Sequence, residues 1–231
     1  MEKVLVDIDG VLATRHVQRF AALCNDILHL AIPIQIIASI ASLREFGCLP
    51  QVAAHRAKVG SGRFRRQMEL MRWHPLNIVG CRVIDGSVEG IQYLAQRSSS
   101  LQYCTARFIE FDAAWNTDVE NSTKSWLKNN DFPNAELVMF CESPRTKLTA
   151  IAAMVRTQKQ PVSLIDDSLD LLLDAFDTLS MRDQRVLKAY LTLIAFDYCE
   201  EECNHPYPLR VVPLQSWQEI QCIEKEFHHV G

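Results

Sequence analysis

The pattern of hydrophobic and polar positions changes character soon after the chain begins. Residues 3–6, Lys-Val-Leu-Val, form an apolar run without alternation, which predicts a strand buried on both faces. From residue 14 to residue 84, apolar residues recur at helical spacing, with breaks at Pro33 and at the stretches GCLP and VGSG. The most hydrophobic part, residues 27–43, is too short for a membrane span and is interpreted as a buried helix. Residues 14–84 are therefore predicted to form a helical module, or cap, inserted after the first strand.

From residue 85 onward, segments of strand character alternate with segments of helical spacing. This alternation predicts a parallel sheet covered by helices on both faces, a three-layer α/β sandwich made of residues 1–13 and 85–231. The predicted strands are 101–104, 135–141, 161–165 and 209–213. The predicted helices are 87–97, 121–130, 146–156, 180–202 and 216–227. The apolar stripe of the long helix 180–202 is interpreted as packing or a dimer contact; its members are Leu187, Leu191 and Ile194.

Composition and charge narrow the classes of function. The chain has 231 residues, of which 48 % are hydrophobic and 23 % are charged, as in an ordinary globular protein. Its net charge of −4 does not favour a nucleic-acid polymer or an acidic membrane as a partner. Eight cysteines without a signal peptide indicate reduced thiols, so we expect a cytoplasmic protein. Separately, we expect the protein to be a monomer or a homodimer.

Candidate site residues, polar in every case but Ala106, follow each of the first four predicted strands of the core. In parallel sheets, ligands bind at the carboxyl ends of the strands, so these side chains are expected to share one site. The candidates are Asp7 and Asp9 after the first strand, Thr105, Ala106 and Arg107 after the second, Lys147 beyond the third, and Asp166 and Asp167 after the fourth.

The chemistry of this set points to phosphate and a divalent cation. Clustered carboxylates repel one another unless a cation lies between them, and hard oxygen ligands suit Mg²⁺. Thr105 and Lys147 offer a hydroxyl and an ammonium group to phosphate oxygens. A carboxylate in such a site can act as a nucleophile, while a second one transfers protons. Taken singly, each residue also has an ordinary alternative: the acids at a solvated strand end or helix N-cap, Thr105 in a turn cap, and Lys147 on a helix surface.

Four motifs resemble those of the haloacid dehalogenase superfamily of phosphohydrolases. They are DIDGVLA at residues 7–13, YCTAR at 103–107, Lys147, and IDDS at 165–168. The resemblance covers nearly the whole chain and implies a Rossmann-like core sheet, with residues 14–84 in the position of the superfamily's mobile cap.

The same resemblance implies a role for each motif residue. Asp7 looks like the nucleophile that forms an aspartyl-phosphate, and Asp9 looks like the general acid/base. Thr105 and Lys147 resemble the pair that holds the phosphate. The implied Mg²⁺ ligands are the Asp7 side chain, the Asp9 backbone carbonyl and Asp166, with Asp167 as a further ligand or a partner of the ligands.

A finer resemblance concerns the substrate. Residues 103–140 followed by Lys147 and LIDDS are similar to the 5′(3′)-deoxyribonucleotidase branch, in which Arg107 would contact substrate or brace the loop. The expected activity is thus hydrolysis of a small phosphomonoester, with a nucleotide as the leading candidate. Two alternatives remain open: a phosphotransferase or mutase, in which another hydroxyl replaces water, and a non-catalytic regulatory protein that has kept the fold.

Two further clusters are open to more than one interpretation. A basic segment in the predicted cap could meet a second phosphate or an acidic substrate tail, or form a solvated helix face; its members are Arg56, Lys58, Arg63, Arg65 and Arg66. The aromatic residues beside it, Phe64 and Trp73, could stack on a base or belong to the core. Cys199, Cys203 and His205 could contribute to a zinc site, although their spacing fits no common motif.

Overall fold

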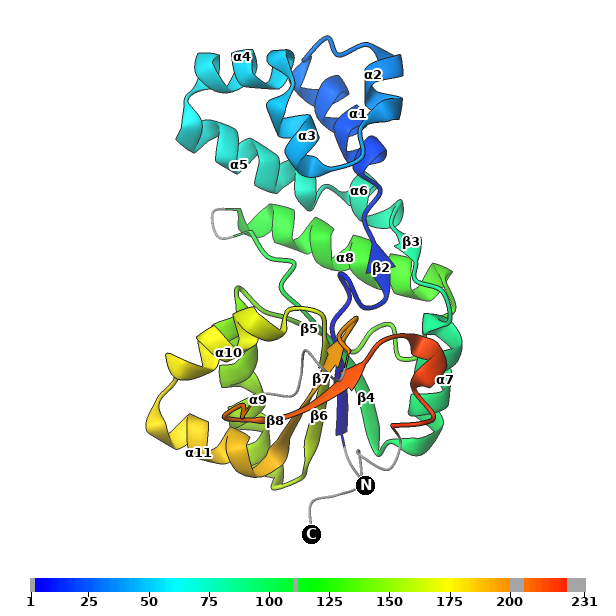
Figure 1. Ribbon diagram of the computed structural model, residues 1–231, viewed down its shortest axis with the longest axis vertical. Helices are drawn as coiled ribbons and strands as arrows, with labels where there is room; N and C mark the ends of the chain where they lie inside the picture. Colours follow the sequence, from blue (N-terminus) through cyan, green and yellow to red (C-terminus); the bar gives the residue numbers. More distant parts are fainter. Residues whose placement is uncertain (1–2, 110–111, 200–205, 224–231) are drawn as a thin grey trace. The chain divides into compact units, whose positions relative to one another are not determined.

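A computed structural model describes residues 3–109, 112–199 and 206–223 of the chain (Figure 1). These residues divide into two compact units. One, here called the core unit, comprises 1–14, 83–108 and 127–231, and the other, the helical unit, comprises 15–82 and 109–126. Segment 109–126 thus groups with the residues of the predicted cap, whereas the functional division into catalytic core and cap stays a prediction.

A six-stranded sheet with the order β5-β4-β1-β6-β7-β8 forms the centre of the core unit, and all of its strand pairs are parallel (Figure 1). Its strands are β1 (Lys3–Val6), β4 (Ser100–Thr105), β5 (Val138–Phe140), β6 (Val162–Asp166), β7 (Leu191–Phe196) and β8 (Arg210–Leu214). A separate two-stranded sheet lies where the chain passes between the units; it pairs β2 (Ala13–Thr14) with β3 (Arg82–Val83).

Helices cover both faces of the large sheet, which confirms the predicted three-layer α/β sandwich. Figure 1 shows α9, α10 and α11 on one face, and α7 with the short 3-10 helix η1 on the other. These elements are α7 (Ser87–Arg97), α9 (Pro144–Gln158), α10 (Leu169–Asp177), α11 (Met181–Tyr190) and η1 (Trp217–Glu219). A long helix, α8 (Ala113–Asn129), begins in the helical unit and ends in the core unit.

Strand β1 is one of the two central strands of the sheet, since two strands lie beyond it on one side and three on the other. Val4, Leu5 and Val6 are at most 2 % exposed, as expected for a continuous apolar run between two helical layers. The chain continues from β1 to β4 and β5 on one side and then crosses to β6, β7 and β8 on the other. The order of strands therefore reverses beside β1, and open α/β sheets bind their ligands at such a reversal.

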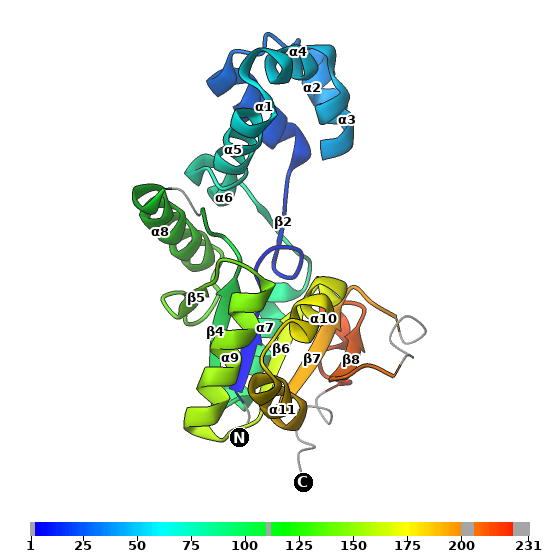
Figure 2. The same cartoon turned by 90° about the vertical axis from the view of Figure 1, so that its left-hand side faces the viewer.

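In the helical unit, helices α1 to α5 pack around an apolar cluster of the unit's own, and the short helix α6 follows them (Figure 2). They are α1 (Val17–Leu28), α2 (Ile34–Ser39), α3 (Leu43–Cys48), α4 (Pro50–Val59), α5 (Ser61–Arg72) and α6 (Pro75–Val79). Phe20 of α1 and Phe46 of α3 meet edge to face at 5.7 Å, an arrangement that aromatic rings favour.

The expectation of one buried helix over residues 27–43 is wrong. Helix α1 ends at Leu28, and the backbone turns through left-handed conformations at His29 and Ala31. The Asn25 side chain accepts a hydrogen bond from the Ile32 amide at 2.7 Å, which stabilises this break ahead of Pro33. Within the described residues, no helix is long and apolar enough to cross a membrane.

The long helix predicted over 180–202 is also wrong, because the chain changes from helix to strand at residue 191. Helix α11 begins at the predicted Ser180 cap, whose hydroxyl accepts from the Asp183 amide, and it ends at Tyr190. The following residues form β7, which is buried along its whole length. A strand buried on both faces is continuously apolar, so its spacing does not distinguish it from a helix.

The C-terminal predictions fall partly outside the described residues. Of the helix predicted over 216–227, the structure describes residues up to 223 and shows only η1 with a following turn. Of the cysteine and histidine cluster, Cys203 and His205 lie outside the described residues. Cys199 is described and is half-buried.

Candidate active site

The predicted site residues of the core unit come together at the carboxyl edge of the sheet. Val6 of β1 pairs with Tyr103 of β4 on one side and with Ile165 of β6 on the other. Asp7 follows Val6 directly, and its amide donates at 2.8 Å to the carbonyl of Ile165, the residue before Asp166 at the end of β6. This register brings the ends of three neighbouring strands to one level.

Lys147 lies between two carboxylates of this edge. Its Nζ donates to Asp7 Oδ1 at 2.9 Å and to Asp166 Oδ2 at 2.7 Å. All three residues are buried, with residue exposures between 4 % and 6 %. Helix α9 positions the lysine in its first turn, where a capping box between Ser143 and Thr146 stabilises the helix start. A buried charge needs a partner, and each charge here has one.

Burial and the neighbouring charges shift the pKa values of Asp7 and Lys147. Burial raises the pKa of Asp7 to about 8; Lys147 opposes the rise, while Asp166 and Asp9 add to it. For Lys147, burial disfavours the ammonium form, but the neighbouring Asp7 and Asp166 outweigh burial and raise its pKa well above the ordinary value. The lysine therefore stays charged.

Thr105 supplies the hydroxyl at this edge. It is the last residue of β4 and is completely buried, and its Oγ1 has no hydrogen-bond partner among the described residues. Leaving a buried hydroxyl unpaired costs about 1–3 kcal/mol, so native proteins rarely do so without a reason. An oxygen-rich ligand at the strand ends would remove this cost.

Arg107 forms a two-pronged ion pair with Asp9. Its Nε donates to Asp9 Oδ2 at 2.8 Å and its Nη2 to Asp9 Oδ1 at 3.1 Å, and its side chain is fully buried. This geometry fixes the Asp9 carboxylate, because a planar guanidinium matches both oxygens at once. The neighbouring Ala106 is half-buried, and its carbonyl accepts from the Phe108 amide at 3.0 Å.

Gly10 and Asp167 approach each other closely. Gly10 has φ of +82°, a conformation that side chains disfavour, and a Cβ built on it would lie 1.8 Å from Asp167 Oδ2. Ser168 Oγ donates to Asp167 Oδ1 at 3.0 Å. Burial, followed by the nearby Asp166, raises the pKa of Asp167. The glycine of the first motif thus makes room for the acid of the fourth.

Three carboxylates are placed so that they could hold a cation together. One oxygen of each of Asp7, Asp166 and Asp167 lies within 4.8 Å of the others. Mg²⁺ prefers hard oxygen ligands and retains several waters, so three carboxylates fit its requirements. Burial first, and the neighbouring carboxylates after it, raise the pKa values of Asp7 and Asp167, and a cation at this position would favour their charged forms.

Trp217 was not anticipated as part of this region. Its indole Nε1 donates at 2.7 Å to the carbonyl of Val11, in the loop that follows Asp9. Both partners are buried, and 206 positions separate them in sequence. No local pattern around residue 217 signals this contact, because it depends on where η1 packs in the folded core.

Comparisons with known proteins support the fold. No family model and no curated protein matches the chain, whereas several solved structures do. A protein from Thermotoga maritima described as a β-phosphoglucomutase has a TM-score of 0.54 at 14 % identity, covering 98 % of this chain and 99 % of that one. A predicted phosphoglycolate phosphatase from Haemophilus somnus gives 0.53 at 11 % identity, with 96 % and 97 % covered.

A family IA haloacid dehalogenase hydrolase from Entamoeba histolytica gives a TM-score of 0.53 at 14 % identity and covers 95 % of both chains. The likeness extends over nearly the full length in each case. The chain therefore has the fold of the haloacid dehalogenase-type hydrolases, as its four motifs predicted.

Proposed function

We propose that the chain is a Mg²⁺-dependent phosphatase that hydrolyses a small phosphomonoester through an aspartyl-phosphate on Asp7. One observation carries the proposal: at a single sheet edge, a buried lysine joins two buried carboxylates beside a buried hydroxyl that finds no partner among the described residues. An anion with several oxygens satisfies both Thr105 Oγ1 and Lys147 Nζ, and phosphate is such an anion.

The reaction takes two displacements at phosphorus. In the first, an Asp7 carboxylate oxygen bonds to phosphorus and the bond to the ester oxygen breaks, while Asp9 donates a proton to that oxygen. In the second, water attacks the phosphorus, Asp9 accepts the water's proton, and the bond to Asp7 breaks to release inorganic phosphate. Arg107 holds the Asp9 carboxylate in position through its two hydrogen bonds.

The residues proposed to hold Mg²⁺ are the side chains of Asp7, Asp166 and Asp167 and the backbone carbonyl of Asp9. Bound there, Mg²⁺ would neutralise charge on the carboxylates and on the phosphate oxygens. Ala106 and Arg107 follow Thr105 directly and are proposed to line the phosphate site. A nucleoside monophosphate is the first substrate to test, since the 103–140 pattern resembles a nucleotidase.

Phosphate release from a panel of phosphomonoesters tests the proposal. The panel includes nucleotides, sugar phosphates and phosphoglycolate, each assayed with Mg²⁺ and with EDTA. We expect release with Mg²⁺ and none with EDTA. The Asp7→Asn variant should lose turnover while keeping its fold by circular dichroism, whereas Asp170→Asn, an exposed acid on α10, should match the wild type.

Two results would overturn the proposal. Near-wild-type turnover by Asp7→Asn would exclude the nucleophile, and no release from any ester would favour the non-catalytic alternative. Product analysis with added alcohols separates hydrolysis from transfer, because a phosphotransferase yields a new ester in place of inorganic phosphate.

A further inference from the structure

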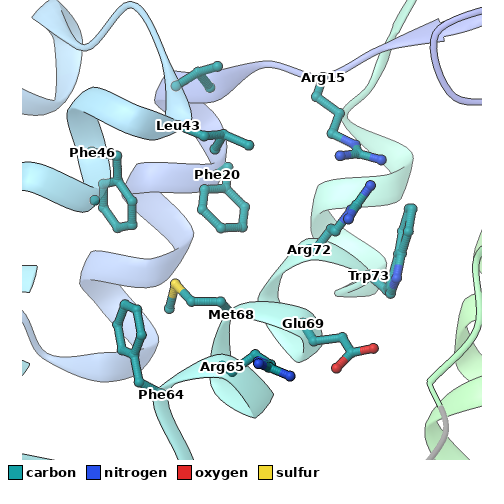
Figure 3. Close-up of a pocket in the computed structure, with 12 residues that line it drawn as sticks. Arg15, Phe20, Leu43, Phe46, Phe64, Arg65, Met68, Glu69, Arg72 and Trp73 are labelled. Carbon is teal, nitrogen blue, oxygen red and sulfur yellow. The ribbon is translucent and has the colours of Figure 1, made fainter. Parts of the chain in front are cut away.

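Three of the chain's four tryptophans belong to the helical unit, and Trp217 belongs to the core unit. Trp73 borders a pocket whose lining residues all belong to the helical unit (Figure 3). Trp126 donates from its indole to the carbonyl of Cys81, also in the helical unit, at 3.1 Å. The contacts of Trp217 lie instead next to the proposed active site.

The proposed acid/base, Asp9, lies in a tight turn of residues 8–13. The carbonyl of Ile8 accepts hydrogen bonds from the amides of Leu12 and Ala13 at 2.9 and 2.8 Å, which closes the turn on itself. Bonds inside the turn fix its shape, but they do not fix how the turn is oriented on the core unit. That orientation depends on bonds from the turn to other segments.

Hydrogen bonds tie the backbone of the turn to other segments of the core unit. The amide of Ile84 donates to the carbonyl of Leu12 at 2.9 Å. The indole Nε1 of Trp217 donates to the carbonyl of Val11 at 2.7 Å, and Val11 is completely buried. Removing the donor of a buried carbonyl leaves that carbonyl away from water without its partner, which the turn can avoid only by moving.

Close packing holds the indole of Trp217 in place. A Cβ built on Gly90 of α7 would lie 2.4 Å from Trp217 Cε3, so the glycine leaves the room that the ring occupies. The ring centroids of Phe196 and Trp217 lie 5.6 Å apart, and Trp217 is 2 % exposed. A donor that packing already holds keeps its hydrogen bond in one direction without losing further side-chain freedom. A phenylalanine ring could occupy much of this space, so packing alone does not explain the indole N–H.

We propose that Trp217 is a positioning residue, whose hydrogen bond to the Val11 carbonyl orients the turn and thereby sets the position of the Asp9 carboxyl group. This inference rests on the proposed function, in which Asp9 transfers protons to and from the reacting oxygens. Displacing such a group by about 1 Å costs on the order of 100-fold in rate, because proton transfer needs a hydrogen-bonded distance. The residues proposed to hold the phosphate belong to β4 and α9. The turn should therefore affect the rate more than substrate binding.

Steady-state kinetics of Trp217→Phe, on an ester that the wild type hydrolyses, tests the effect on the reaction. The variant keeps an aromatic ring and loses the N–H donor. We expect kcat to fall by about 10- to 100-fold, while KM stays close to the wild-type value. A full chain with 3-benzothienylalanine at position 217 has the shape of tryptophan without the N–H donor, and its kcat should fall to a similar extent.

Amide hydrogen exchange, followed by mass spectrometry, tests the turn without any catalysis. We expect the amides of Leu12 and Ala13 to exchange faster in Trp217→Phe, because the turn opens more often once this bond is lost. Trp126→Phe is the matched control, since it also removes a hydrogen bond from a buried indole to a backbone carbonyl. In that control, both amides should exchange at the wild-type rate.

Three results would overturn the proposal. The first is a wild-type kcat, or unchanged exchange of the turn amides, in a folded Trp217→Phe protein. The second is wild-type behaviour of the 3-benzothienylalanine protein, which would assign the role to ring packing; this protein also decides the case in which Trp217→Phe does not fold. The third is a rise in KM that accounts for the whole loss of kcat/KM. If the wild type hydrolyses no ester, the proposed function fails instead, and the exchange experiment then decides whether the indole holds the turn.

Discussion

Replacing Lys147 with methionine removes the positive charge between Asp7 and Asp166 but keeps most of the side-chain volume. Asp7 and Asp166 then remain buried without the cation that pairs with them, and breaking a buried ion pair costs about 3–5 kcal/mol. The variant can limit this cost by binding one additional proton at a carboxyl group. That proton costs about 1.36 kcal/mol for each unit by which the pH exceeds the ordinary carboxyl pKa, which for these aspartates is 3.8.

The destabilisation of Lys147→Met depends on pH, because the cost of binding the additional proton sets its upper bound. The upper bound on destabilisation is about 5 kcal/mol near pH 7.5 and about 2 kcal/mol near pH 5.5. The carboxyl pKa is raised in the folded variant, so the folded state binds more protons than the unfolded state. Stability is therefore retained at low pH and lost as the pH rises toward the folded pKa.

Urea denaturation followed by circular dichroism, in EDTA, measures the difference. Lys128→Met serves as the control, because Lys128 is an exposed residue at the end of α8. We expect Lys147→Met to be destabilised strongly near neutral pH and by about 2–3 kcal/mol less at the lower pH, and Lys128→Met to differ little from the wild type. If Lys147→Met loses no more stability than the control, or the same amount at both pH values, the buried-charge argument is wrong.

Three other predictions concern single positions. Gly10→Ala should lose about 1–2 kcal/mol of stability in urea denaturation, because Gly10 has a positive φ that alanine disfavours. It should also lose turnover, because Asp167 must move to make room for the new methyl group. The control Gly62→Ala in α5 should be neutral or stabilising in the same denaturation experiment. Ser143→Ala should cost about 1 kcal/mol by removing the capping box of α9; a loss smaller than the measurement error would contradict this. Iodoacetamide should label exposed Cys48 quickly and leave Cys24 unmodified in the native state, because burial raises the pKa of the Cys24 thiol to about 12. Mass spectrometry measures the labelling of each cysteine, and equal rates for the two would refute this prediction.

The sequence was sufficient to predict the sheet edge because parallel topology makes strand ends meet. Residues that follow different strands, such as Asp7 and Asp166, must then lie together whatever the loops do. The sequence does not reveal that these two aspartates are buried or that both bind Lys147, because these features depend on how β1, β6 and α9 pack together.

Strand β7 shows where pattern reading fails. Leu187, Leu191 and Ile194 match the spacing of a helix face, yet only the first of them is helical. In the centre of a sheet both faces of a strand are apolar, so alternation disappears and the choice depends on neighbours far away in sequence. The pairing of Arg107 with Asp9, 98 positions apart, is of the same long-range kind.

The hydrogen bond from Trp217 to Val11 has a consequence for how the chain folds. The loop after the first strand is synthesised well before the indole that holds it, which comes more than two hundred residues later. While the chain is being made, this loop lacks one of its native contacts. Strand β1, with the two aspartates that follow it, can fold early. The site reaches its final geometry only after the segment around Trp217 has left the ribosome and packed against the core.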